Sequence, residues 1–474
     1  MRVCLYGCGN RCKILLKLIE RSNIELVGIV DSNQSRWGEK VGHVVVSSPE
    51  CLRKDSNTYV CVTFFGENDY EPIWTQLKED FDVDERKILS FQGLIRIIYN
   101  QIICIPTISI DNNKEVQTIF DGSWIFGVGG VESWIETTVC ELIRRGKPIK
   151  LLTTKEQTKK FVDNEECLID YSVERSREFN VEDVKKSVDI LIENLPCTLV
   201  FSRADEVLLA ASLIKCCYPE FIRIITVVHG SCDGLVRDVC GYDDVTEKYF
   251  CVSNATKNAL LNLNVNPEKC ELINSPIIYQ PIENKYYSLK KTEPIRLGYA
   301  GRIVTFHKRA DLLLDLIELL ERWNVNYIFE IAGEGNYVSE LLAYIIDNNL
   351  TEKIKYLGVL QREEVFKFWE TKDISINVSD SEGRPFSNIE AMLCGAVPVV
   401  TATKGILDDV EDGITGYVVN IGDINSMANK INYLADNRFL LKKIGKAAQD
   451  SMLEKTDIEK YVEIWNQTLM SKGC

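Results

Sequence analysis

Short apolar runs alternate with amphipathic stretches of helical length along almost the whole chain. Apolar runs bounded by glycine or polar residues are typical of buried parallel strands, and the stretches between them have the apolar spacing of helices. The alternation therefore predicts an α/β fold in which mostly parallel sheets carry helices on both faces. The expected strands are 2–6, 26–30, 59–64, 116–120, 149–153, 198–201, 223–229, 249–252, 295–300, 327–332, 354–357, 374–378 and 397–400.

The chain is too long for one ordinary domain, because it has 474 residues. Interruptions of the alternation predict four parts. These are a Rossmann-like accessory module at 1–100, an α/β domain at 106–290, a second α/β domain at 291–460 and a C-terminal tail at 461–474.

Composition excludes several classes of function. A net charge of −15 argues against broad nucleic-acid binding, which needs a basic surface. The 17 cysteines include no Cys-x-x-Cys pair, so we expect them to act mainly as small core residues in a reducing compartment. The only histidines are His43, His229 and His307, so we expect no metal site. With neither a secretory signal nor an apolar run of about 18 residues, a soluble, cytoplasmic protein is expected.

The first module has the element order of a dinucleotide-binding βαβ unit. Gly7 and Gly9 follow the first expected strand, and Asp31 ends the second, where an acidic residue could meet a ribose hydroxyl. Cys12 replaces the third glycine of that fingerprint, which should loosen the helix–strand contact or shift a pyrophosphate. Both NAD binding and a bare Rossmann-like scaffold stay open. The module also resembles those at the front of several bacterial polysaccharide-biosynthesis proteins.

The stretch from Ser379 to Val400 places a glycine turn and two carboxylates between a strand and a helix. Gly383 lets the backbone approach a ligand, and the free N–H groups of a helix that starts near Phe386 favour an anion such as a diphosphate. Glu382 and Glu390 would repel that anion, so their expected partners are neutral hydroxyl groups beside it. A phosphate flanked by hydroxyl groups describes a sugar nucleotide.

A structural interpretation of the same stretch also stays open. Ser387 and Glu390 have the spacing of a capping box, in which the carboxylate reaches back to its own helix start. Glu382 would then be a solvated loop residue.

Other candidates lie where expected strands end. Arg302 and Lys308 follow the strand 295–300 and could converge on an anion beside Gly383, although either alone would be a surface residue. The run that contains Gly129 and Gly130 precedes an expected helix, and it either contacts a ligand through its backbone or makes a tight turn.

His229 ends an apolar strand, at the edge where open α/β sheets bind ligands. It is either a hydrogen-bonding residue of the fold or a member of the site.

A basic patch stands out in this acidic chain. It is either a solvated surface or a contact with an anionic membrane that carries a lipid-linked acceptor. Its members are Arg144, Arg145, Lys147, Lys150, Lys155, Lys159 and Lys160.

Taken together, the motifs from about 115 to 470 resemble those of retaining, nucleotide-sugar-dependent glycosyltransferases of family 4. The resemblance implies a GT-B fold, in which two Rossmann-like domains face a cleft, here preceded by an extra Rossmann-like module. The matching motifs are Gly129-Gly130-Val131-Glu132, Gly301-Arg302 with Lys308, Ala332-Gly333-Glu334-Gly335, Glu382-Gly383-Arg384-Pro385, Glu390-Ala391-Met392, Gly395, Pro398, Gly413 and Gly416.

The resemblance also implies a role for each candidate. Arg302 and Lys308 would hold the donor diphosphate, Glu390 the ribose and Glu382 the transferred sugar. His229 would lie near the donor sugar or the acceptor. Backbone groups of Gly383, Phe386, Ser387, Gly129 and Gly130 would complete the phosphate site.

The leading hypothesis is a retaining hexosyltransferase-type enzyme that uses a UDP- or GDP-sugar, needs no metal or other cofactor and serves surface polysaccharide synthesis. The acceptor would be a glycan, a lipid-linked glycan or another glycoconjugate. Two alternatives stay open: a non-catalytic GT-B subunit that binds a glycan or a partner, and NAD-dependent modification of nucleotide sugars by the first module. The sequence leaves the donor, the acceptor and the oligomeric state open.

Overall fold

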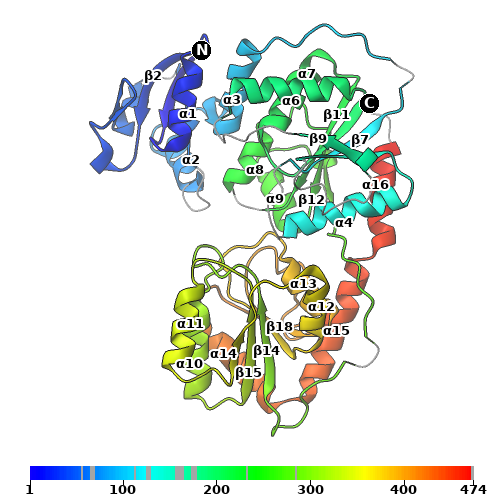
Figure 1. Cartoon of the computed structure of the whole chain (residues 1–474). Coiled ribbons are helices and arrows are strands. Elements are labelled where there is room, and N and C mark those ends of the chain that lie inside the picture. Colours follow the sequence, from blue (N-terminus) through cyan, green and yellow to red (C-terminus); the bar gives the residue numbers. More distant parts are fainter. Residues whose placement is uncertain are drawn as a thin grey trace. The chain divides into compact units, whose positions relative to one another are not determined.

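The computed structural model describes residues 1–54, 57–64, 70–111, 114–123, 130–154, 165–171, 179–230, 233–282 and 285–470. The described chain contains three predominantly parallel sheets with helices packed on them, which confirms the α/β fold class (Figure 1). It divides into two compact units. Unit 1 comprises 1–251, 256–272 and 465–474, and unit 2 comprises 252–255 and 273–464.

The N-terminal module of unit 1 is built on a six-stranded sheet of order β3-β4-β2-β1-β5-β6. All its ladders are parallel except the short β3–β4 pair. Its elements are β1 (Arg2–Tyr6), α1 (Asn10–Ile19), β2 (Glu25–Val30), η1 (Gln34–Arg36), β3 (Lys40–Val41), β4 (Val44–Ser47), η2 (Pro49–Lys54), β5 (Tyr59–Val62), α2 (Tyr70–Glu79), η3 (Glu85–Lys87), β6 (Ile88–Ser90) and α3 (Phe91–Ile102).

The second sheet of unit 1 has seven parallel strands in the order β13-β12-β11-β10-β7-β8-β9. Its central strand β10 is buried along its whole length, as expected for a strand covered on both faces. The elements are β7 (Gln117–Asp121), α4 (Gly130–Arg144), β8 (Ile149–Thr153), η4 (Glu165–Cys167), β9 (Leu168–Asp170), α6 (Val181–Glu193), β10 (Cys197–Phe201), α7 (Glu206–Cys217), β11 (Ile222–Val228), α8 (Asp233–Cys240), β12 (Lys248–Cys251), α9 (Asn254–Asn262), η5 (Pro267–Lys269) and β13 (Cys270–Leu272).

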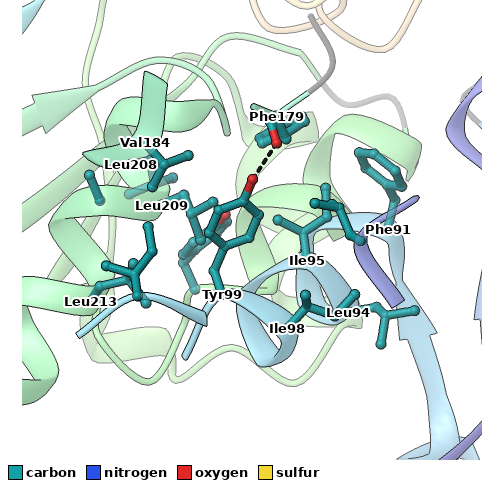
Figure 2. Packing of buried hydrophobic residues seen from close by; sticks show 14 of the residues in the cluster. Phe91, Leu94, Ile95, Ile98, Tyr99, Phe179, Val184, Leu208, Leu209 and Leu213 are labelled. Atoms are coloured by element: carbon teal, nitrogen blue, oxygen red, sulfur yellow. Dashed lines mark hydrogen bonds between the residues drawn. The ribbon is translucent and has the colours of Figure 1, made fainter. Parts of the chain in front are cut away.

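The N-terminal module and the seven-stranded sheet domain share one hydrophobic core. Helix α3 supplies Phe91, Leu94, Ile95 and Tyr99 to this core, which also includes Leu209 of α7, and the Tyr99 hydroxyl donates to the Phe179 carbonyl (Figure 2). Because α3 carries apolar residues at helical spacing, it can bury one face in this shared core. The module is therefore packed against the domain that follows it.

Polar contacts reinforce that packing. The Arg11 guanidinium lies 2.8 Å from Asp238 of α8, and the Tyr242 hydroxyl donates to Gln92 at 2.8 Å. A Cβ atom on Gly241 would lie 3.1 Å from the backbone nitrogen of Gly93, so the two backbones approach closely at this point.

Unit 2 is built on a six-stranded parallel sheet of order β16-β15-β14-β17-β18-β19. In Figure 1 its sheet lies between α10 and α11 on one side and α12, α13 and α15 on the other. The elements are β14 (Ile295–Ala300), α10 (Leu312–Arg322), β15 (Tyr327–Ala332), α11 (Val338–Asp347), β16 (Ile354–Tyr356), α12 (Arg362–Glu370), β17 (Ile374–Asn377), α13 (Phe386–Leu393), β18 (Val397–Thr401), β19 (Tyr417–Val419), α14 (Ile424–Asp436), α15 (Phe439–Lys455) and α16 (Ile458–Met470).

The stretch expected as a C-terminal tail begins inside α16, which continues to Met470. From Trp465 onward it groups with unit 1. The Trp465 ring is buried there, with its centroid 5.3 Å from that of Phe120 and 4.8 Å from that of Phe250.

Candidate active site

The candidate donor-binding residues of unit 2 lie in loops at the carboxyl edge of its sheet. Strands β14 and β17 are neighbours, with Leu297 opposite Ile374, and both run toward the same edge. The loop after β14 carries Arg302 and Lys308, and the loop after β17 carries Glu382. This is the edge where open α/β sheets place their ligands.

Lys308 and Glu382 form an ion pair at this edge. Lys308 Nζ lies 2.6 Å from Glu382 Oε1, and the two side chains are only 17% and 9% exposed. The same carboxylate oxygen accepts a hydrogen bond from Ser379 Oγ at 2.7 Å. Because Asn377 Oδ1 accepts from the Ser379 backbone N–H, the end of β17 fixes the hydroxyl that holds Glu382. Sequence analysis predicted that both charged residues lie at this edge, but it did not predict that they form an ion pair.

Two further ion pairs, both made by Arg309, hold the Lys308 loop in place. His307 and Arg309 have φ values of 62° and 47°, in the left-handed region that costs energy for such residues. The loop is held by Arg309, which bonds Asp311 at 2.9 Å and Asp380 at 3.2 Å. The backbone N–H of Asp380 also donates to the His307 carbonyl at 2.8 Å. The two loops are therefore tied together on both sides of Lys308.

Arg302 is exposed at the same edge. Its carbonyl accepts a hydrogen bond from the Tyr299 hydroxyl at 2.9 Å, which fixes the backbone but leaves the side chain out of the contact. No ion pair or hydrogen bond joins the Arg302 guanidinium to another residue within the described ranges. The structure thus brings Lys308 and Glu382 together and leaves Arg302 in solvent.

Two glycines of the motif Ala332-Gly333-Glu334-Gly335 allow close backbone approach. Gly333 has a φ of +133°, and a Cβ atom there would lie 1.8 Å from the Gly301 carbonyl oxygen. Gly335 has a φ of +157°, and its Cβ would lie 2.2 Å from the Ile303 carbonyl oxygen. Only glycine fits at either position. Gly333 and Gly335 therefore let their backbone pack closely against Gly301 and Ile303, in the loop that leads to Lys308.

The start of α13 is not a capping box. The helix begins at Phe386, Pro385 occupies the N-cap position, and no side chain caps the helix. Because Ser387 lies inside the first turn, its hydroxyl does not serve as the cap, and the capping-box interpretation of Ser387 and Glu390 is wrong. Pro385 has no N–H to contribute, so the first backbone N–H groups of the helix are those of Phe386 and Ser387.

Glu390 is left with a carboxylate that can bind a ligand. It is half-buried, and within the described part of the chain no hydrogen bond or ion pair engages its side chain. Burial raises the pKa of Glu390 to about 7, against a smaller lowering by the charge of Arg362. A carboxyl group whose ionisation is costly is stabilised by hydroxyl groups that donate to it.

Arg384 has a structural role in the same loop. Its guanidinium forms two hydrogen bonds with Asp409, at 3.0 and 2.9 Å, and both side chains are at most 2% exposed. A Cβ atom on Gly405 would lie 1.7 Å from the Gly383 carbonyl oxygen, so the loop after β18 presses directly on the Gly383 turn. These contacts fix the backbone between Glu382 and α13.

His229 follows β11 in unit 1, at the carboxyl edge of the seven-stranded sheet. Its ring meets the Trp134 ring edge to face, with centroids 4.7 Å apart. Nε2 is buried and has no hydrogen-bond partner among the described residues, and burial lowers the pKa of His229 to about 3. The imidazole is therefore neutral at ordinary pH and can exchange a hydrogen bond but not act as a cationic acid.

The remaining expected site residues are only partly described. Gly130 is the exposed first residue of α4, while Gly129 lies outside the described residues. In the basic patch, Arg144 and Arg145 both bond Glu141, and Lys150 donates to the Glu166 carbonyl. The patch members 155, 159 and 160 lie outside the described residues. Among the described members of the patch, the charges of Arg144 and Arg145 are therefore partly compensated by Glu141.

Three residues that position the candidate site residues at this edge were missed by sequence reasoning. Asn377 and Ser379 position Glu382, and Asp409 holds Arg384. Asn377 and Ser379 are polar residues at the end of the apolar run 374–378, and this change in polarity is the sequence signal from which they could have been predicted.

Within the described ranges there is no cluster of three or more His, Cys, Asp or Glu side chains that could hold a metal ion, and no helix long and apolar enough to cross a bilayer.

Comparisons with known proteins agree with this arrangement. Residues 282–451 match the family model for glycosyl transferases group 1, and residues 1–89 match the C2185-like, N-terminal model. The chain is 32% identical over 176 residues to a Staphylococcus aureus poly(ribitol-phosphate) alpha-N-acetylglucosaminyltransferase, which covers 37% of this chain and 35% of that relative. It is 22% identical to a Bacillus anthracis N-acetyl-alpha-D-glucosaminyl L-malate synthase, over 54% of this chain and 69% of that protein. The chain thus spans about a third of the first of these relatives.

Solved structures show the same fold. Anabaena HepE in complex with UDP-glucose matches with a TM-score of 0.62 at 16% identity, covering 75% of this chain and 99% of that one. A variant of S. aureus TarM, in complex with fondaparinux, alpha-GlcNAc-glycerol and UDP, matches with a TM-score of 0.52 at 16% identity, covering 99% and 100%. These findings confirm the resemblance to GT-B glycosyltransferases of family 4. The chain has that fold, and residues 282–451 form a glycosyltransferase group 1 domain.

Proposed function

We propose that the chain is a retaining glycosyltransferase that moves a hexose from a nucleotide-diphosphate sugar to a glycan or glycoconjugate acceptor. The observation that carries the proposal is the largely buried Lys308–Glu382 ion pair. Lys308 lies in the loop after β14, and Glu382 lies in the loop between β17 and α13. A cation and a carboxylate held together at a helix start suit a donor whose phosphate and hydroxyl groups are adjacent.

In this proposal the cations bind the donor phosphates and the carboxylates bind its hydroxyl groups. Lys308 leaves Glu382 to bind the donor diphosphate, and Arg302 turns in from solvent to bind the same group. Glu382, still held by Ser379, then accepts hydrogen bonds from the sugar hydroxyls. Glu390 accepts hydrogen bonds from the ribose, which favours its ionised form.

The chemical step needs no protein base in this account. The bond between the anomeric carbon and the phosphate oxygen breaks, and an acceptor oxygen forms a bond to the same carbon from the same face. The acceptor's proton moves to the departing phosphate oxygen. Lys308, Arg302 and the backbone N–H groups at the start of α13 stabilise the negative charge that develops on the leaving group.

The comparisons support this choice of donor and pathway. HepE is described in complex with UDP-glucose and TarM in complex with UDP, so UDP-sugars are the first donors to test. One relative is named as a poly(ribitol-phosphate) alpha-N-acetylglucosaminyltransferase and another as an amylovoran biosynthesis glycosyltransferase of Erwinia amylovora. These names favour a role in surface polysaccharide synthesis over glycan binding without catalysis.

A donor panel tests the proposal. UDP- and GDP-sugars are added to the full chain, and thermal stabilisation and release of the nucleoside diphosphate are measured for the wild type, Lys308→Ala and Glu382→Ala. Lys446→Ala is the matched control, because Lys446 forms an exposed ion pair with Asp450 at 2.8 Å. We expect one donor to stabilise the wild type and the control, and turnover to fall in both site variants. If no donor binds, or if the site variants turn over like the control, the proposal fails.

The stereochemistry needs its own measurement. Proton NMR of the first product formed from an α-linked donor should show an α-linked product. A β-linked product would overturn retention while leaving the transferase assignment intact.

A further inference from the structure

A cavity of about 620 Å³ lies in the N-terminal module, beside the ends of β2 and β5 and against α2. Its walls include Asp31 and Asn33 after β2, Phe64 after β5, and Gln76 on α2. The volume is in the range of small-molecule sites, and the carboxyl edge of an open α/β sheet is where such sites form. This cavity is separate from the residues proposed to bind the donor, which lie in unit 2.

Two polar side chains in the cavity are held in fixed positions. Asp31 is 3% exposed, and its oxygens accept from the backbone N–H groups of Cys8 at 3.2 Å and Asn33 at 2.9 Å and from the Cys8 thiol at 3.0 Å. A carboxylate has about four acceptor positions, so Asp31 keeps about one for a ligand hydroxyl. The Gln76 amide oxygen accepts from the Tyr6 hydroxyl at 2.9 Å, which leaves the amide N–H groups as donors.

The charge of the cavity wall disfavours an anion. Asp31, Glu79 and Asp80 all line the cavity, whereas Arg36 is the basic residue among the lining side chains described. The Arg36 guanidinium forms two hydrogen bonds with Glu39, at 3.0 and 3.2 Å, so its charge is already compensated. The surplus of carboxylates repels phosphate groups and favours neutral ligands that donate hydrogen bonds.

The first part of the turn that would hold a pyrophosphate is already engaged by the protein. A Cβ atom on Gly7 would lie 2.5 Å from the Phe64 ring and 2.7 Å from Thr63 Oγ1, so these side chains cover the turn. The N–H of Gly7 donates to the Val30 carbonyl and that of Cys8 to Asp31. Backbone N–H groups used in this way are not free to bind phosphate oxygens.

We propose that this cavity binds a nucleoside, with its ribose hydroxyls donating to Asp31 and its base against the Phe64 ring. Asp31 and Phe64 suit the ribose and base of such a ligand, whereas the side chains over Gly7 and the surplus of carboxylates disfavour the pyrophosphate of a dinucleotide. The module therefore suits a nucleoside better than NAD. This inference does not rest on the proposed transferase activity.

Calorimetric titration of the full chain tests it, with adenosine, uridine, NAD and D-glucose as ligands. We expect one of the two nucleosides to bind with one site per chain and D-glucose not to bind. Asp31→Asn should weaken nucleoside binding at least about tenfold, because it removes the charge from a hydrogen-bond acceptor. Thr75→Trp, which places a large side chain in the cavity wall, should abolish binding.

A matched control makes the outcome decisive. Lys78→Trp puts the same side chain on an exposed position of α2 and should leave the affinity unchanged. If Asp31→Asn lowers the melting temperature, Thr75→Trp and Lys78→Trp decide the question. The proposal is overturned if neither nucleoside binds at millimolar concentration, if binding survives Thr75→Trp or is lost in Lys78→Trp, or if NAD binds more than tenfold tighter than adenosine.

Discussion

Lys308 Nζ lies 2.6 Å from Glu382 Oε1, so the cation assigned to the donor diphosphate and the carboxylate assigned to the donor sugar form a single ion pair. Both side chains are largely buried, and Ser379 supplies a second hydrogen bond to the carboxylate. Each charge therefore compensates the other, and removal of either leaves its partner buried without an opposite charge.

This pairing predicts energetic coupling between the two residues. Lys308→Met and Glu382→Gln should each lower the free energy of unfolding, while the double variant should lose less than the sum of the two. A coupling of about 1–3 kcal/mol is expected for residues in direct contact. Urea unfolding of the four proteins measures it. Strict additivity would show that the two side chains do not interact in solution.

Glu390 predicts a pH dependence of nucleotide binding. Burial raises the pKa of this carboxyl to about 7, so its ionised fraction rises as the pH increases from 6 to 8. Because ribose hydroxyls donate to the ionised form, UDP should bind more tightly at pH 8, by up to about tenfold from this group. The comparison is with Glu390→Gln, in which only the titration of UDP itself remains. Equal pH dependence in both proteins would contradict the role given to Glu390.

The close backbone contact at Gly333 predicts that even a small substitution there is strongly destabilising. Gly333→Ala places a methyl group 1.8 Å from the Gly301 carbonyl oxygen at a φ of +133°, so the loop that carries Arg302 and Lys308 must move. We expect the free energy of unfolding to fall by about 3 kcal/mol or more, with weaker donor binding. Gly358→Ala is the matched control, because Gly358 has a φ of +70° but open space around its Cβ. That control should lose only about 1–2 kcal/mol, and an equal loss in both variants would argue against a close backbone contact.

The burial of His229 predicts that the folded protein loses stability as the pH falls. Its folded-state pKa is lowered to about 3 by burial, whereas an unfolded histidine titrates near pH 6.5. Between these values the unfolded chain binds a proton that the folded chain does not, so stability falls as the pH drops below about 6.5. In His229→Leu the loss of stability between pH 7 and pH 5 should be smaller by about 2 kcal/mol. His43→Leu, at an exposed position, should behave like the wild type. Identical losses in wild type and His229→Leu would show that His229 is not buried in its neutral form.

Sequence patterns predicted the sheets well because buried parallel strands are apolar and end at glycine or polar residues. The strands at 295–300 and 327–332 occur at those positions, and α13 begins at Phe386. The capping box failed because Pro385 takes the N-cap position, which moves Ser387 into the first turn. Spacing alone does not decide which residue precedes a helix.

Long-range pairings could not be predicted. Lys308 and Glu382 are 74 positions apart, and the argument from charge gave each a different ligand group. The Arg11–Asp238 contact that fixes the N-terminal module spans 227 positions. In both cases the side chains are brought together by the packing of separate elements, which a local pattern does not contain. The ligand roles of all the candidate site residues, Lys308 and Glu382 included, stay predictions.

The central claim is that Lys308 stabilises the charge that develops on the departing nucleoside diphosphate. The most direct measurement is the steady-state release of nucleoside diphosphate from the preferred donor by the wild type, Lys308→Met and Lys446→Met. Losing one fixed donor to a developing charge costs roughly 3 kcal/mol of transition-state stabilisation. We therefore expect kcat to fall on the order of a hundredfold in Lys308→Met and to be unchanged in Lys446→Met. A Lys308→Met variant that retains wild-type kcat would contradict the account.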